Sequence, residues 1–297
     1  MAEKYILHMV TPLKHMSPFD VNMAVDAGCD VVITHTDVSL GEVSGLVQDA
    51  IFSRPPKTGA RTGMFFGGKN AVLALDMMAA AKKALVPPFG LSLFADPAGS
   101  FTTAAALVAC AEKTLRQKKN RDLRGLKVAV FGATGVVGFS AGVIAAFEGA
   151  KVVLVGYDGI RRVSDAAKEI KTRFGVDVTP ADGSDDAKKA SILADAEAIF
   201  CAGRAGARVL SKAQIEAARN LLLAADVNAV PPSGTEGLEA NASGTPLTSG
   251  ALGVGPLAVG GVKYKTEFGL FQKMISAAKP VHFDFREAFA LARELNA

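Results

Sequence analysis

Few cysteines and no cluster of metal ligands occur in the 297 residues. The three cysteines, Cys29, Cys110 and Cys201, are far apart, and none belongs to a C-x-x-C motif or a Cys/His cluster. A disulfide framework and a structural zinc site are therefore not expected, and neither is any other metal site. The sequence instead predicts buried, reduced thiols in a cytoplasmic protein.

Long apolar runs are also missing. The first ten residues, MAEKYILHMV, lack the apolar core of about 7–15 residues that a signal peptide needs. A membrane span needs about 18 or more apolar residues without charges, and the longest apolar run, from Val136 to Val155, contains Glu148 and Lys151. We expect neither a leader nor a membrane partner.

Charge of one sign is concentrated at only one place. Seven lysines and arginines lie between Lys113 and Lys127, but no aromatic residue accompanies them to stack on a base. A solvated helix end and linker explains this stretch, so nucleic acid is not an expected partner. The net charge of +4 is compatible with a small anionic ligand.

What is present favours a folded α/β protein. Hydrophobic residues make up 49% and charged residues 21%, which is typical of globular proteins and unlike a disordered chain. Short β-branched or apolar runs alternate with helical patterns, which is typical of parallel sheets. In the first part we expect strands at 4–9, 29–34, 63–66 and 91–95, and helices at 18–27, 42–52, 70–85 and 100–118.

The alternation restarts after a charged segment, which predicts a domain boundary near residues 119–125. Beyond it we expect strands at 127–131, 152–155, 198–201 and 221–225, and helices at 136–148, 161–173 and 212–219. The Gly-rich segment 249–261 predicts a loop that crosses back and covers a cleft. We therefore expect a discontinuous α/β substrate domain (1–120 and 263–297) and a Rossmann-type parallel-sheet domain for a dinucleotide (121–262).

The strand expected at 127–131 runs into a glycine-rich turn where a helix opens. Glycine permits the tight turn, the approach of a pyrophosphate to backbone amides, and close packing of helix on strand. The helix start adds N–H groups and partial positive charge for the phosphates. The predicted cofactor-binding residues are Gly132, Ala133, Thr134, Gly135, Val136, Val137 and Gly138. A strict G-x-G-x-x-G motif would begin at Ala133, so Gly132 is expected to supply the turn; a cofactor-free strand–helix turn is the alternative.

Asp158 follows the next strand, 20 residues after Gly138. This spacing suits a carboxylate that accepts a hydrogen bond from the ribose 2′-hydroxyl of NAD. Arg161 and Arg162, about one turn further on, are able to pair with the 2′-phosphate of NADP. We predict that both cofactors are used, with NAD preferred. A plain turn and a solvated helix face are the alternatives.

Two further turns follow expected strands at the edge of the sheet where ligands bind in open α/β folds. One is Ala202-Gly203, and the other contains Asp226 and Asn228. Asn228 is predicted to hold the nicotinamide carboxamide. Ordinary strand–helix turns are the alternative.

Several motifs occur in an order that resembles one family over nearly the whole chain. They are SPFD at 17–20, FGG at 66–68, PF at 88–89, DPAGSFTTAAA at 96–106, GATGVVG at 132–138, DVNAVPP at 226–232 and GALGVGPLAVGGVKYK at 250–265. In these motifs the chain resembles the NAD(P)-dependent methylene-tetrahydromethanopterin dehydrogenases of methylotrophic bacteria. That family is distantly similar in architecture to the bifunctional folate dehydrogenase/cyclohydrolases.

The resemblance implies a hydride transfer from methylene-tetrahydromethanopterin to nicotinamide, within one-carbon metabolism and formaldehyde oxidation, by a homo-oligomer. The methylene carbon lies between two nitrogens, so loss of hydride leaves a delocalised methenyl cation and releases no proton. A general base is therefore not required. The protein must instead hold the reacting carbons in near-attack geometry and place negative potential where positive charge develops.

The resemblance also assigns residues to the substrate. Asp20 is the expected stabilising carboxylate or pterin-orienting group, and Phe19 is expected to stack on the pterin. Lys263 matches the family's active-site lysine, and Lys265 is the alternative match. Ser100, Thr102 and Thr103 match the family's substrate-binding segment. The structural alternatives are a solvated first-turn carboxylate, a core phenylalanine, surface lysines and helix-capping hydroxyls.

Two other functions stay open. One is a dehydrogenase of the same architecture that acts on methylene-tetrahydrofolate or a shikimate-like acid. The other is a non-catalytic protein that binds a dinucleotide. The lysine pair, Asp20 and the two threonines favour an enzyme over a sensor.

Overall fold

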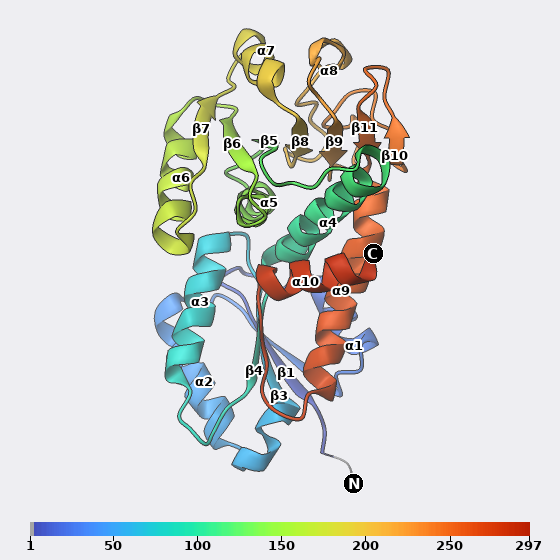
Figure 1. Ribbon diagram of the computed structural model, residues 1–297. Helices are drawn as coiled ribbons and strands as arrows, with labels where there is room; N and C mark the ends of the chain where they lie inside the picture. Colours follow the sequence, from blue (N-terminus) through green and yellow to red (C-terminus); the bar gives the residue numbers. More distant parts are fainter. Residues whose placement is uncertain (1–2) are drawn as a thin grey trace. The chain divides into compact units, whose positions relative to one another are not determined.

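Two β-sheets with helices packed on them organise residues 3–297 in the computed structural model of the chain (Figure 1). Met1 and Ala2, part of the stretch considered for a leader, lie outside the described residues. Unit 1 contains residues 3–102 and Tyr264–Leu291, and unit 2 contains Thr103–Lys263 and Ala292–Ala297. The first boundary between the units thus follows Thr102, which is earlier in the sequence than the expected domain boundary near residues 119–125. The assignment of a substrate role to one part and a dinucleotide role to the other stays a prediction.

Unit 1 is built on a five-stranded parallel sheet in the order β12-β4-β3-β1-β2. Helices α2 and α3 lie on one face, and α1 and the later part of α9 lie on the other (Figure 1). The strands are β1 (Ile6–Val10), β2 (Val31–His35), β3 (Thr62–Phe66), β4 (Ser92–Ala95) and β12 (His282–Phe283), and the helices are α1 (Pro18–Asp26), α2 (Val43–Phe52) and α3 (Ala71–Ala84). All four predicted strands and the first three predicted helices are confirmed.

Local signals explain the ends of these elements. Ser17 caps α1 by accepting a hydrogen bond from the Asp20 N–H at 3.4 Å, and Pro18 occupies the first helical position. Asn70 caps α3 in the same way through the Leu73 N–H. The core of unit 1 is aromatic, with the Phe94 ring 5.3 Å from that of Phe65. Such edge contacts between buried rings favour one packing arrangement.

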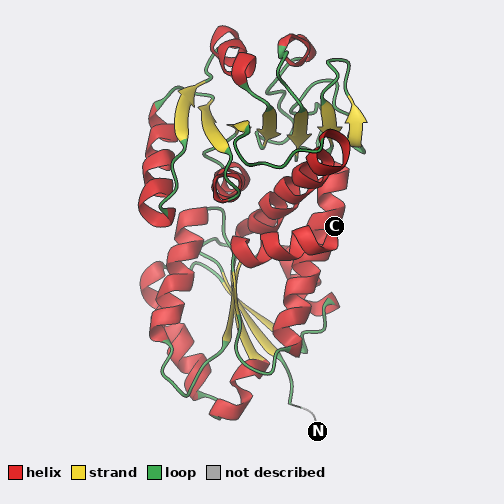
Figure 2. Cartoon of the chain, viewed as in Figure 1, coloured by secondary structure: helices red, strands yellow, loops and turns green. Residues whose placement is uncertain are grey.

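Unit 2 carries a seven-stranded sheet in the order β10-β11-β9-β8-β5-β6-β7. Only β10 runs antiparallel to its neighbour, and the six others follow the order 3-2-1-4-5-6 of a Rossmann fold. The strands are β5 (Lys127–Phe131), β6 (Lys151–Gly156), β7 (Thr179–Asp182), β8 (Ala198–Cys201), β9 (Leu223–Asp226), β10 (Ser243–Pro246) and β11 (Leu252–Val254). The predicted Rossmann-type sheet is confirmed (Figure 2).

Helices cover both faces of this sheet, α5 and α6 on one side and α7 and α8 on the other (Figure 1). They are α5 (Val136–Phe147), α6 (Arg161–Phe174), α7 (Asp186–Asp195) and α8 (Lys212–Ala217). Three further helices, α4 (Ser100–Lys119), α9 (Pro256–Ser276) and α10 (Phe285–Leu295), contain the divisions between the units. None of the helices described between residues 3 and 297 has the length and apolarity that a membrane span needs.

The segment 249–261 is not the loop that its glycines suggested. Residues 252–254 form β11, parallel to β9, and α9 begins at Pro256. A Cβ on Gly253 would lie 2.5 Å from Leu238 Cδ1, and one on Gly255 would overlap the Glu239 carbonyl oxygen. These glycines therefore serve close packing and not flexibility.

An ion pair between the half-buried Arg293 and a buried carboxylate joins the last six residues to unit 2. The Arg293 guanidinium donates to both carboxylate oxygens of Glu112, at 2.7 and 3.0 Å, and Glu112 is only 3% exposed. Arg116 approaches the same carboxylate at 2.7 Å, and Arg293 also pairs with Glu148. The bidentate geometry compensates for burying the carboxylate.

All three cysteines are free and buried, as predicted. Burial raises the pKa of the Cys110 thiol to about 11 and those of Cys29 and Cys201 to about 12. The thiols therefore stay protonated near neutral pH and pack as small apolar groups.

Candidate cofactor and substrate sites

The turn between β5 and α5 has the geometry of a phosphate-binding turn. Gly132 has a φ of +76°, and its carbonyl accepts a hydrogen bond from the Gly135 N–H at 3.0 Å. A Cβ on Gly132 would overlap the Ala202 carbonyl at the end of β8, and one on Gly138 would overlap the Gly132 carbonyl oxygen. Gly132 therefore supplies the turn, as predicted, and Gly138 permits the close approach of α5.

Gly135 has a different reason to be glycine. A Cβ there would meet only the Gly132 carbonyl oxygen, at 3.3 Å, and the residue is exposed. It caps α5, whose first N–H groups, from Val136 onward, have no partner within the helix. These N–H groups and the helix dipole fit a pyrophosphate at this edge. Thr134, Val136 and Val137 are half-buried, whereas Ala133 and Gly138 are enclosed by protein.

Asp158 lies just beyond β6 and is paired with Arg162. Its Oδ2 lies 3.1 Å from Arg162 Nη1, and the Arg162 guanidinium lies 5.8 Å from the centre of the Tyr157 ring. The hydrogen bond and charge of Asp158 raise the pKa of Arg162. The structure thus joins the residue predicted for the ribose of NAD to one of the two arginines predicted for the phosphate of NADP. Arg161 is exposed beside them.

The turns after β8 and β9 differ in how accessible their residues are to a ligand. Ala202 and Gly203 are half-buried at the end of β8, where the strand order of the sheet reverses. Asp226 is fully buried, and burial raises the pKa of its carboxyl although backbone N–H groups donate to it. Asn228 is 5% exposed, and its amide bonds to the surrounding loops. The structure therefore does not favour the predicted direct contact of Asn228 with a carboxamide.

A pocket of about 400 Å³ opens in unit 1 at the carboxyl end of β1 and the start of α1. Asp20 lines it and is 1% exposed, so it is not a solvated first-turn carboxylate. Lys14, His15 and Lys69 stand on the pocket wall and are exposed to solvent. A buried carboxylate in a pocket that two exposed lysines also line is able to orient a ring with N–H groups and to favour positive charge nearby. Phe19 is 47% exposed, so it is not a core residue.

The three hydroxyl residues at the start of α4 differ in their accessibility. Thr102 is fully buried, and its hydroxyl donates to Asp96 Oδ2 at 2.6 Å. Asp96 Oδ1 also accepts the Phe101 N–H at 2.7 Å, which makes Asp96 the cap of this helix. The structure gives Thr102 a structural hydrogen bond and does not favour its predicted substrate contact, which stays a prediction. Ser100 is 7% exposed, and Thr103 is half-buried.

Lys263 and Lys265 lie on α9, where two residues turn about 200° around the axis, so the side chains leave opposite faces. Lys263 is half-buried and Lys265 is exposed. This difference favours Lys263 as the residue that faces a site. Glu267, one turn after Lys263, is fully buried. Sequence reasoning missed both Glu267 and Asp96, since nothing in the local pattern marks their burial.

Histidines and metal ligands offer no competing site. His8 and His35 lie on neighbouring strands, and His8 Nδ1 is 3.1 Å from His35 Nε2. Burial lowers the pKa of His8. Burial also lowers the pKa of His282. Within residues 3–297, no group of three His, Cys, Asp or Glu side chains is placed to hold a metal ion.

Comparison with known proteins identifies the family. The sequence model of the family described as methylene-tetrahydromethanopterin dehydrogenase, N-terminal, matches residues 18–98. The NAD(P)-dependent methylenetetrahydromethanopterin dehydrogenase of Methylorubrum extorquens is 53% identical over 291 residues, covering 98% of each chain. The chain belongs to the methylene-tetrahydromethanopterin dehydrogenase family. The family resemblance predicted from the motifs is thereby confirmed.

More distant relatives agree with the fold. The bifunctional protein MdtA of Methylorubrum extorquens is 33% identical over 279 residues, 94% of each chain. The quinate dehydrogenase of Corynebacterium glutamicum, solved in complex with NAD, has a TM-score of 0.53 at 14% identity, covering 97% of this chain and 98% of that one. At that identity the likeness concerns the fold alone.

Proposed function

We propose that the chain oxidises methylene-tetrahydromethanopterin to the methenyl cation by hydride transfer to NAD or NADP, with NAD preferred. The observation that carries this proposal is the 53% identity over nearly the full length to a dehydrogenase named for this substrate. The β5–α5 turn fits the dinucleotide independently, because three glycines leave room for the turn, the helix and a phosphate. The cofactor, when bound, supplies the hydride acceptor.

The substrate carbon loses a hydride with both bonding electrons, and the positive charge spreads over the two flanking nitrogens. No proton leaves in this step, so the protein needs to position and not to deprotonate. Asp20, in the unit 1 pocket, is the proposed carboxylate that orients the pterin and favours the developing charge. Lys263 is the proposed hydrogen-bond donor to the pterin, and Phe19 and Thr103 are the proposed neighbours of the ring.

On the cofactor side, the first N–H groups of α5 hold the pyrophosphate in this proposal, and Asp158 accepts from the ribose. Arg162 and Arg161 are the proposed partners of a 2′-phosphate. The half-buried turn at Ala202 and Gly203 borders the middle of the cofactor. We further propose a cytoplasmic homo-oligomer: family membership supports the assembly, and the free cysteines support a reducing compartment.

Asp158→Ala is expected to raise the ratio of kcat/KM with NADP to kcat/KM with NAD by about tenfold or more, which corresponds to about 1.4 kcal/mol. The carboxylate repels a 2′-phosphate and also engages Arg162 at 3.1 Å, so its removal lifts the repulsion and releases the guanidinium. Asp165→Ala, which removes an exposed carboxylate on the adjacent helix α6, is the matched control. An unchanged ratio would remove Asp158 from cofactor selection.

The proposed function is tested by a substrate comparison. The purified protein is mixed with methylene-tetrahydromethanopterin, methylene-tetrahydrofolate or a shikimate-like hydroxy acid, each with NAD and with NADP, and the absorbance of the reduced nicotinamide is followed. Turnover with the methanopterin substrate, fastest with NAD, is expected. Turnover confined to the folate or to a hydroxy acid would replace the proposal, and cofactor binding without any turnover would indicate a sensor.

A further inference from the structure

The loop after β9 has a buried base and an exposed tip. Asp226, Asn228, Gly234 and Thr235 are buried, and together they form what we call the base of the loop. Residues 229–232, the tip, are exposed, and Val230 is 53% exposed. The loop contains no helix or strand of its own between 227 and 234. Since the loop has no regular backbone hydrogen-bond pattern, its shape depends largely on side chains that hydrogen-bond to the backbone.

Asp226 closes the base of this loop. One carboxylate oxygen accepts the Asn228 N–H at 2.8 Å, and the other accepts the Thr235 N–H at 2.6 Å. The two ends of the loop are thus held by one side chain. A Cβ on Gly234 would lie 2.8 Å from both Asp226 Oδ2 and Cys201 Sγ, so only glycine fits against the base.

Asn228 holds the tip. Its Oδ1 accepts the Val230 N–H at 3.0 Å and the Gly206 N–H at 3.2 Å, and its Nδ2 donates to the Pro232 carbonyl at 2.9 Å. Both lone pairs of the amide oxygen and one of the two amide hydrogens are therefore used inside the protein. The contact with Gly206 also joins this loop to the one that follows β8.

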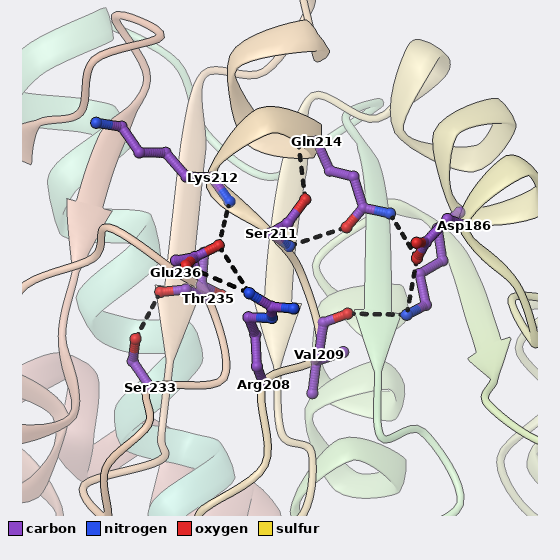
Figure 3. A network of polar contacts seen from close by, with 10 residues as sticks. Asp186, Arg208, Val209, Ser211, Lys212, Gln214, Ser233, Thr235 and Glu236 are labelled. Atoms are coloured by element: carbon purple, nitrogen blue, oxygen red, sulfur yellow. Dashed lines mark hydrogen bonds and ion pairs between the residues drawn. The ribbon is translucent and has the colours of Figure 1, made fainter.

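The two loops form one body through further contacts. The Val209 and Leu210 N–H groups donate to the Gly234 carbonyl, at 2.8 and 2.9 Å. Beside them, Glu236 accepts from Arg208 and from the Lys212 N–H, and the Ser233 hydroxyl donates to the Thr235 carbonyl (Figure 3). A displacement at the base is therefore transmitted to both loops.

The sheet topology places the loops after β8 and β9 on the side of the sheet that binds one half of a dinucleotide. In a Rossmann fold each half of the sheet binds one mononucleotide, across the point where the strand order reverses. Asp158 follows β6, so the adenosine half belongs to the β5–β6–β7 side of the sheet. The other half, which carries the nicotinamide, belongs to the side of β8 and β9 and hence to the loop tip.

We propose that Asn228 is a positioning residue that holds residues 229–232 as a wall for the nicotinamide end of the dinucleotide, and is not itself a ligand of the carboxamide. Asp226 supports it by closing the base. The proposal rests on the dinucleotide binding included in the proposed function. Val230 is the apolar side chain of the wall that contacts the nicotinamide half.

The experiment is a calorimetric titration of the whole protein without pterin, using NAD, ADP-ribose and 3-aminopyridine adenine dinucleotide. Asn228→Ala removes three hydrogen bonds and is expected to weaken NAD binding about tenfold or more. The affinity for ADP-ribose, which lacks nicotinamide, stays within about twofold. The aminopyridine analogue, whose ring carries no carbonyl group to accept from the remaining Asn228 N–H, loses as much affinity as NAD does.

Two further variants keep the outcome clear if Asn228→Ala folds poorly. Val230→Ser changes the exposed tip and leaves the base intact, and it is expected to weaken NAD and spare ADP-ribose. Ser233→Ala loses a single hydrogen bond within the loop and is expected to bind all three ligands normally.

Other results would overturn the proposal. A loss of affinity in Asn228→Ala that is much smaller for the aminopyridine analogue than for NAD would indicate a direct contact of Asn228 with the carboxamide carbonyl. An equal loss for ADP-ribose would indicate a general effect on the domain, and no loss would remove the role. NAD binding without oxidation of the pterin would refute the proposed function alone, whereas no NAD binding by the wild-type protein would refute both.

Discussion

Lys263→Ala is expected to lower kcat/KM for methylene-tetrahydromethanopterin at least about tenfold, a loss of about 1.4 kcal/mol of transition-state stabilisation. The side chain is half-buried on α9, and its ammonium offers three N–H donors for orienting a pterin. Misorientation of the substrate carbon costs rate even where the substrate still binds. Steady-state kinetics with both substrates varied in turn measure the effect, and the KM for NAD is expected to stay unchanged.

The neighbouring lysine provides the control. Lys265 is exposed on the opposite face of the helix, so Lys265→Ala is expected to keep nearly the wild-type rate. Near-normal turnover by Lys263→Ala would reject the assignment. A large loss in the Lys265 variant with little in the Lys263 variant would show that the family's lysine corresponds to Lys265.

Alanine substitutions at two glycines of the β5–α5 turn are expected to have different effects, one mainly on stability and the other mainly on NAD binding. Gly138→Ala places a Cβ against the Gly132 carbonyl, so the backbone must move, and a loss of about 1–3 kcal/mol in the free energy of unfolding is expected. Gly135→Ala meets only a contact at 3.3 Å and replaces a helix-capping glycine, so a smaller loss, below about 1 kcal/mol, is expected. Its methyl group stands where the phosphates approach α5, so NAD binding is expected to weaken at least about tenfold.

Denaturant unfolding and calorimetric NAD titration, performed on both variants, distinguish the two effects. Normal NAD affinity in Gly135→Ala would place the pyrophosphate elsewhere. A Gly135→Ala protein that is as unstable as Gly138→Ala would show that the exposed glycine also serves packing, and the separation of roles would fail.

Much of the fold was predictable because apolar residues are spaced differently in strands and in helices, and because glycines mark the ends of many of these elements. The strand at 198–201 and the helix start at 136 were predicted to the residue. The elements β7 and α7 were missed because their apolar residues are few: β7 reads TPAD, and Leu193 is the one fully buried residue of α7. An edge strand and a solvated helix leave only a weak hydrophobic pattern.

In the candidate site, the sequence could predict those features that the residue type alone determines, such as the conformation of a glycine in a tight turn. Glycine at 132 is required by a positive φ and a close carbonyl, and both follow from the motif. The burial of Thr102 and Asn228 was not predictable, because an accessible ligand contact and a buried hydrogen bond need the same polar residue types. Only the position of Asp96 shows that the Thr102 hydroxyl donates to the carboxylate that caps α4, and only the two loops together show that the Asn228 amide is already used.

The C-terminal segments have a consequence for how the chain is made. Unit 1 gains β12 only when residues 282–283 exist, and Glu112 gains its bidentate partner only when Arg293 exists. Because the ribosome delivers residues in order, both units lack part of their stabilising contacts until residues 282–293 have been translated. Each unit therefore reaches its final structure late in synthesis, and a chaperone that shields the nascent N-terminal half would act during that interval.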